Sequence, residues 1–318
     1  MPVNSASGAS CTINLLRPSP PSSVQPPTQV PCHEYKHETS IDPTTGAVRE
    51  TVTIESQQAC PFEIVLDIKP TAYASICPTS NQTDSTAAND SQLPIPSDYI
   101  VNTTLDGIPV SAYLQSKSAR NFPVNLHSVL SHDRKTFKSY QFAKINLVDP
   151  DDYQDVKNPA DKICEEEKVI KSLGTIQLDV FKCTLGERPI GSAGGLHTST
   201  TNQMKFSERS KKARLSTTAG LSEQTASRLP PPLTVPYVIT QDPHPFLQFF
   251  FKYKPRVILE AEGTITRPVV EVEVDSESEN KCKAKNQNNK RVKTEAEDQK
   301  APKKKSKIID LTGSDESD

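Results

Sequence analysis

Apolar and polar side chains alternate in several short segments of the chain, and this period of two restricts the possible folds more than any other feature. In residues 48–55, Val48, Val52 and Ile54 share one face, and residues 62–68, 136–148, 174–183 and 245–254 show similar alternation. Such segments form strands with one face against a core. Helical periodicity is almost absent. We therefore expect an all-β fold, an antiparallel β-sandwich with disordered N-terminal and C-terminal tails.

Local patterns add detail to this expectation. Residues 48–55 and 62–68 follow each other closely and are expected to pair as neighbouring strands. Asp106-Gly107 lies between two extended segments, and this dipeptide tolerates the positive φ angles of a tight hairpin. Residues 71–97 have loop chemistry throughout, and a short helix is expected over residues 255–262.

The composition limits how much of the chain can pack. Only 34% of the 318 residues are hydrophobic, 27 are prolines, and the mean hydropathy is −0.55. One domain with unfolded flanks fits these values. We expect a disordered, proline-rich N-terminus over residues 1–30, a β-sandwich over residues 31–266, and a disordered charged tail over residues 267–318.

Neither a membrane segment nor a secretory signal is expected. No stretch approaches the ~18–20 apolar residues that span a bilayer, and the N-terminus has no basic region followed by an apolar one. The seven cysteines are scattered and form no Cys-x-x-Cys pair, which favours reduced thiols over disulfides or zinc. Cys32, His33 and His37 lie close together, and we interpret them as polar surface rather than a metal site.

The sequence offers no catalytic constellation. Its six histidines are scattered, and Gly-x-Ser-x-Gly, His-Glu-x-x-His and P-loop motifs are missing. We therefore expect a protein that is not an enzyme, with no catalytic residues, no metal and no cofactor.

Three stretches together resemble a domain of unknown function that is widespread in fungal proteins. They contain Gly174-Thr175-Ile176, then Ser210-Lys211-Lys212-Ala213, and finally Phe249, Phe251 and Tyr253 in a strand that leads to a Gly-Thr-Ile. The resemblance covers roughly residues 31–266. It implies a β-sandwich, and it implies no activity or substrate.

Four basic side chains lie within the second of these stretches and are candidates for contact with phosphate or an acidic protein. They are Arg209, Lys211, Lys212 and Arg214. The other interpretation is a solvated charged loop, because no aromatic side chains are interleaved for stacking on bases.

Basic clusters gather near the C-terminus. Residues 281–307 hold eleven Lys or Arg against three acids. Such clusters suit a nuclear-import receptor, and a solubilising tail is the alternative. The residues of the predicted localisation signal are Lys290, Arg291, Lys293, Lys303, Lys304, Lys305 and Lys307. Val292-Lys293-Thr294-Glu295 also resembles an acceptor site for SUMO, the small ubiquitin-like modifier, with Lys293 as the modified residue.

The last residues resemble a SUMO-interacting motif. Ile308, Ile309, Asp310 and Leu311 are followed by Asp315 and Glu316. Aliphatic residues in an extended segment can add to a sheet edge, and the acids can face a basic rim. Phosphorylation of Ser314 and Ser317 would strengthen that contact. A chance aliphatic cluster is the alternative.

These features predict a nuclear, non-catalytic interaction protein that binds SUMO or sumoylated partners. The alternative is a protein that binds histones or other chromatin components. It rests on residues 270–279, VEVEVDSESE, whose five acids precede the basic clusters.

Overall fold

The computed structural model describes residues 1–17, 27–77, 94–119, 123–131, 136–153, 162–189, 199–210, 212, 217–227 and 234–266. All of them belong to one compact unit, Met1–Pro268. No helix within these ranges combines the length and the apolar character needed to cross a membrane.

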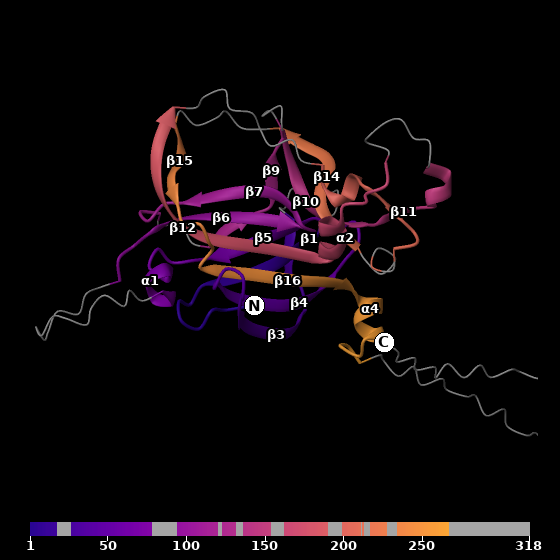
Figure 1. Ribbon diagram of the computed structural model, residues 1–318, viewed down its shortest axis with the longest axis horizontal. Coiled ribbons are helices and arrows are strands. Elements are labelled where there is room, and N and C mark those ends of the chain that lie inside the picture. Colours follow the sequence, from indigo (N-terminus) through magenta and orange to yellow (C-terminus); the bar gives the residue numbers. More distant parts are fainter. Residues whose placement is uncertain are drawn as a thin grey trace, which may run out of the picture. The chain divides into compact units, whose positions relative to one another are not determined.

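One layer of the unit is a seven-stranded sheet (Figure 1). Its strand order is β3 (Glu34–Ile41), β4 (Val48–Ser56), β16 (Leu247–Pro255), β12 (Thr175–Pro189), β6 (Asp98–Leu105) and β7 (Ile108–Gln115), with β15 (Thr234–Gln241) paired to the far half of β12. Neighbouring strands are antiparallel except β4 and β16, which are parallel.

The second layer contains two smaller sheets. One has the order β2 (Thr28–Pro31), β1 (Ser10–Arg17), β5 (Phe62–Asp67) and β8 (Val124–Leu126). The other has the order β14 (Thr217–Ser227), β10 (Thr136–Lys144) and β9 (Ser128–Leu130). A parallel pair, β11 (Asn146–Val148) and β13 (Lys205–Ser207), lies beside them. The helices are short: α1 (Ala72–Ile76), α2 (Glu167–Ser172), α4 (Arg256–Ala261) and 3-10 turns at Pro150–Tyr153 and Thr201–Gln203.

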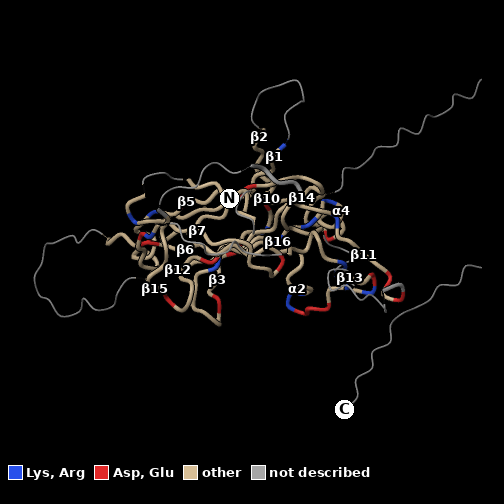
Figure 2. Tube along the Cα trace, turned by 90° about the horizontal axis from the view of Figure 1, so that it is seen from above, with Lys and Arg blue, Asp and Glu red and all other residues tan. Residues whose placement is uncertain are grey.

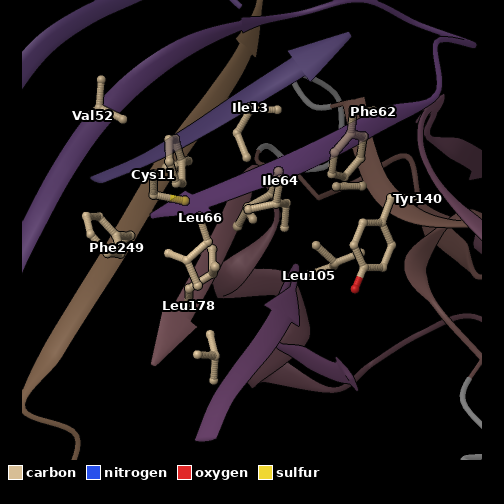
Figure 3. Close-up of a cluster of buried hydrophobic side chains, with 14 of the residues drawn as sticks. Cys11, Ile13, Val52, Phe62, Ile64, Leu66, Leu105, Tyr140, Leu178 and Phe249 are labelled. Carbon is tan, nitrogen blue, oxygen red and sulfur yellow. The ribbon is translucent and has the colours of Figure 1, made fainter. Parts of the chain in front are cut away.

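The main core lies between the two layers. Figure 3 shows Ile13 of β1 and Ile64 of β5 in one cluster with Val52 of β4 and Phe249 of β16, and all four side chains are fully buried. Aromatic rings continue the contact, since the ring of Phe142 lies 4.4 Å from that of Phe62 and 5.0 Å from that of Tyr253. Each such side chain contributes about 1.5–3 kcal/mol on burial. The predicted β-sandwich is confirmed.

The predicted pairing of residues 48–55 with 62–68 is wrong. β4 pairs with β3 and β16, and β5 pairs with β1 and β8 in the other layer. Both segments have an apolar face, and these faces meet across the core rather than side by side. Sequence alternation specifies that a face is buried, but not which strand lies next to it.

The prediction of a disordered tail over residues 1–30 is wrong for residues 10–17, which form β1. Cys11, Ile13 and Leu15 alternate along β1 and are 0, 0 and 3% exposed, so this strand belongs to the core. After Pro2 the next proline is Pro18, and β1 therefore keeps the backbone donors that a sheet requires. Residues 18–26 and 267–318 lie outside the described part. The short helix expected over 255–262 is confirmed as α4, and the loop expected over 71–97 contains helix α1.

Candidate functional site

The predicted hairpin at Asp106-Gly107 is confirmed, because Asp106 has φ +49° and Gly107 has φ +80° between β6 and β7. Gly107 is also closely packed. A Cβ added there would lie 2.9 Å from Cβ of Ser172 in α2. The turn therefore requires glycine both for its backbone angle and for its contact with α2.

The carboxylate of Asp106 is fully buried and connects the hairpin to distant strands. Its Oδ1 atom accepts hydrogen bonds from the backbone N–H of Gly174 (2.8 Å) and of Thr175 (3.2 Å) at the start of β12. The Tyr253 hydroxyl of β16 donates to the same oxygen at 2.6 Å. The hairpin, β12 and β16 thus meet at one oxygen atom.

The second oxygen of Asp106 forms hydrogen bonds that connect the hairpin to β14 in the other layer. Oδ2 accepts a hydrogen bond of 2.9 Å from the Thr201 hydroxyl and another of 2.9 Å from the backbone N–H of Ala219 in β14. Burial raises the pKa of Asp106 to about 6, and the hydrogen bonds, that of Tyr253 first, oppose this rise. Since five donors occupy its oxygens, this carboxylate acts as a structural junction rather than a binding group.

The two described members of the predicted anion-binding loop contact different partners. Arg209 forms an exposed ion pair with Asp151 at 2.7 Å. The Lys212 ammonium donates to the backbone carbonyl of Lys171 in α2, and burial lowers the pKa of Lys212 while nearby Asp106 opposes the shift. Lys211 and Arg214 lie outside the described residues. Basic and acidic residues lie close together along the chain around α2, β11 and β13 (Figure 2).

A groove of about 620 Å³ lies between β9 and the β6–β7 part of the large sheet. Its lining combines hydroxyl and amide groups with apolar side chains, and Asp179 of β12 is the one ionisable residue among the described lining residues. The lining residues are Asn102, Thr104, Pro109, Val110, Ser111, Ala112, Ser128, Val129, Leu130 and Asp179. A hydrogen bond of 2.8 Å between the hydroxyls of Ser111 and Tyr140 joins the two layers beside the groove. This volume is within the range of ligand sites in proteins, about 300–1,000 Å³.

Asp179 is held in position by two glutamines. Gln177 donates from Nε2 to Oδ1 (2.8 Å) and Oδ2 (2.9 Å), and Gln248 of β16 donates to Oδ1 at 2.7 Å. Burial raises the pKa of Asp179, and the glutamine hydrogen bonds and Arg49 oppose the rise. The arrangement places a partly buried carboxylate at a groove, where it can meet a ligand.

Cys32, His33 and His37 do not come together as a group of three potential metal ligands. Among the described residues, no cluster of three or more His, Cys, Asp or Glu side chains is close enough to hold a metal ion. The interpretation as polar surface is wrong for Cys32, which is 6% exposed, whereas His33 and His37 are exposed. Burial raises its pKa to about 12, which keeps the thiol protonated. The six described cysteines are all free.

Comparison with known proteins agrees with the resemblance found in the sequence. A family model described as a domain of unknown function (DUF7918) matches residues 28–268. The chain belongs to this family. No curated protein and no solved structure matches it. In this DUF7918 domain, two of the three stretches quoted above donate hydrogen bonds to Asp106. The donors are Gly174 and Thr175 of the first stretch and Tyr253 of the third. Lys212, from the second stretch, lies near Asp106.

Sequence reasoning missed both carboxylate positions. The Asp106-Gly107 pattern predicts only a turn, and the alternation in residues 174–183 indicates only a strand with one polar face. The pattern Gln177-x-Asp179 gave a partial indication, because residues two apart in a strand share a face. The partner Gln248 lies 69 positions away and comes from a different strand, so the alternation pattern could not reveal it.

Proposed function

We propose that this protein is a non-catalytic nuclear adaptor that binds SUMO or sumoylated partners through its C-terminus. The observation that carries the proposal is the placement of Ile308, Ile309 and Leu311 directly before Asp315 and Glu316 in an otherwise polar segment. The aliphatic side chains would fill a groove beside a sheet edge of SUMO, main-chain hydrogen bonds would fix the register, and the acids would face a basic rim. These residues lie outside the described part of the chain.

The expected affinity is weak. Burial of three aliphatic side chains contributes about 5–9 kcal/mol, at roughly 1.5–3 kcal/mol each, and ordering of the segment costs about 2–5 kcal/mol. Main-chain hydrogen bonds and the contacts of the acids add to this difference, and we expect a dissociation constant on the order of 10–100 μM. Several linked SUMO units, or a second contact through the folded domain, would raise the effective concentration and tighten binding.

We further propose that the basic clusters deliver the protein to the nucleus. An extended lysine-rich segment suits the acidic groove of an import receptor, and Lys303, Lys304, Lys305 and Lys307 form the densest run. We also propose that Lys293 is modified by SUMO. A fungal origin of the chain is a further proposal and rests on the three quoted motifs alone.

The motif is tested by capture of the full chain on immobilised SUMO. Replacement of Ile308, Ile309 and Leu311 by alanine should reduce capture to background. A matched variant with alanine at Val269, Val270 and Val272 removes aliphatic side chains elsewhere in the same region and should be captured like the wild type. Equal capture of both variants would exclude the motif.

The import signal is tested by alanine substitution of Lys303, Lys304, Lys305 and Lys307, which should retain the protein in the cytosol.

A second candidate function, histone or chromatin binding, is favoured by a different observation. Residues 270–279 carry five acids immediately before the basic clusters, and an acidic segment attracts basic histone surfaces. Full-length protein should then capture core histones at low salt and release them as salt rises. Neutralisation of Glu271, Glu273, Asp275, Glu277 and Glu279 to glutamine or asparagine should abolish capture. Unchanged capture would remove this candidate.

A further inference from the structure

Asp179 is a partly buried acidic side chain that forms no ion pair with a basic residue in the described part of the chain. Its oxygens accept hydrogen bonds only from the neutral amides of Gln177 and Gln248 among the described residues. Arg49 is the nearest source of positive charge in this network, but its guanidinium forms an ion pair with Asp42 and donates to Gln248 Oε1 at 3.0 Å. A carboxylate away from bulk water gains most from a cation when none is already paired with it.

The supporting amides fix the orientation of this carboxylate. Gln248 is 3% exposed and is itself held by Arg49, so its side chain has little freedom. Gln177 bridges both oxygens of Asp179. Because Oδ1 accepts two of these hydrogen bonds and Oδ2 one, Oδ2 retains acceptor capacity for a further donor. The group is therefore positioned before any ligand arrives.

The walls of the groove indicate what kind of molecule would bring a positive charge to Asp179. Apolar side chains of β7 and β9, among them Pro109, Ala112 and Leu130, suit the aliphatic stem of a long basic side chain. Asn102 and Thr104 of β6 lie on the same face as Asp179 and present an amide and a hydroxyl, which suit peptide N–H and C=O groups. The groove volume of about 620 Å³ exceeds the space needed by one side chain and is open to a short segment of chain.

We propose that the groove between β7 and β9 binds an extended peptide that carries one lysine or arginine, with Asp179 as the counter-ion of its charged head. Among the described residues the lining contains a single carboxylate, so a small polycation such as spermidine would leave most of its charges unmatched. A peptide with one basic residue between small or apolar neighbours matches both the charge and the walls. This site lies in the folded domain and does not depend on the C-terminal residues proposed to bind SUMO.

A peptide-mixture experiment on the full-length protein tests the proposal. The probe is a degenerate pentapeptide mixture with lysine fixed at the centre, and the comparison mixture carries norleucine there, which keeps the stem and removes the charge. Retained peptides on immobilised protein are quantified by mass spectrometry. We expect the lysine mixture to be retained roughly tenfold better, because the charged head pairs with Asp179 in a partly desolvated site. Equal retention of the two mixtures, or retention of neither, would overturn the proposal.

Two variants connect the retention to the groove. Asp179→Asn keeps an oxygen that can accept from the glutamines and removes the charge, so it should abolish the preference for lysine. Asp151→Asn removes an exposed carboxylate that is not part of the groove lining, and it should leave the preference for lysine unchanged. Matching thermal unfolding curves for the variants and the wild type establish that the fold is intact. A preference that survives Asp179→Asn, or spermidine competing as well as the best lysine peptide, would refute the assignment. Stronger retention of the lysine peptides after deletion of residues 281–307 would also refute the assignment, because it would show that the chain's own basic segment occupies the groove.

Discussion

The hydroxyl of Tyr253 donates a hydrogen bond of 2.6 Å to the buried carboxylate of Asp106, although 147 positions separate the two residues. Tyr253 lies on β16 and Asp106 in the β6–β7 turn, and β12 runs between these strands in the sheet. The pair therefore fixes the end of three strands together.

Tyr253→Phe should destabilise the domain by about 1–2 kcal/mol, because one hydrogen bond to a buried charged group is lost while the ring remains. Urea unfolding measures the change. Tyr113→Phe is the matched control. Burial raises the pKa of Tyr113, and its hydroxyl has no hydrogen-bond partner among the described residues, so loss of this hydroxyl should change stability by less than about 0.5 kcal/mol. Equal effects of the two substitutions would contradict the role of the Asp106 junction.

The stability of the wild type relative to Asp106→Asn should fall as pH rises. Burial raises the pKa of Asp106 from 3.8 to about 6, so the folded protein binds this proton more tightly than the unfolded chain does. The contribution is complete below about pH 4 and is lost as pH rises through about 6. Unfolding at a series of pH values should show a relative decrease of about 1–3 kcal/mol. A relative increase would mean that the five hydrogen bonds lower the pKa below its ordinary value.

Gly107→Ala should cost more stability than Gly46→Ala. Both glycines have positive φ, +80° and +74°, so both substitutions strain the backbone. Only at Gly107 does the added Cβ meet another element, at 2.9 Å from Ser172 Cβ, whereas nothing lies within 4 Å of the Cβ added at Gly46. We expect an extra loss of about 1–3 kcal/mol for Gly107→Ala, measured by thermal or urea unfolding. Equal losses would show that α2 moves aside without cost.

The thiols of Cys11 and Cys32 should react very slowly with iodoacetamide in the folded protein. Burial raises the pKa of Cys32 to about 12 and that of Cys11 well above its ordinary value, so little reactive thiolate is present near neutral pH. Among the described cysteines, mass spectrometry should show modification of the partly exposed Cys60, Cys77 and Cys164 before that of Cys11 and Cys32. Denaturation should remove the difference, and rapid labelling of Cys32 in native protein would contradict the burial of β1 and its neighbours.

The sequence by itself determined the fold class and several local elements. Alternation in residues 48–55 and 245–254 identified β4 and β16, and the positive-φ preference of Asp106-Gly107 identified the hairpin, because these preferences depend on residues close together in the chain. The same local reasoning failed at β1, because the proline-rich segment after Arg17 predicts disorder whereas the alternation of Cys11, Ile13 and Leu15 just before it forms a buried strand.

Only the tertiary structure decided which strands are neighbours and which polar groups meet. The parallel pairing of β4 with β16 joins segments about two hundred positions apart, and the junction at Asp106 and the Gln177–Asp179–Gln248 network are likewise built from distant strands. Alternation tells each strand which face to bury, but the burial of apolar surface has no direction and does not specify the partner. Packing in three dimensions makes that choice, and it therefore determines where the groove and its carboxylate lie.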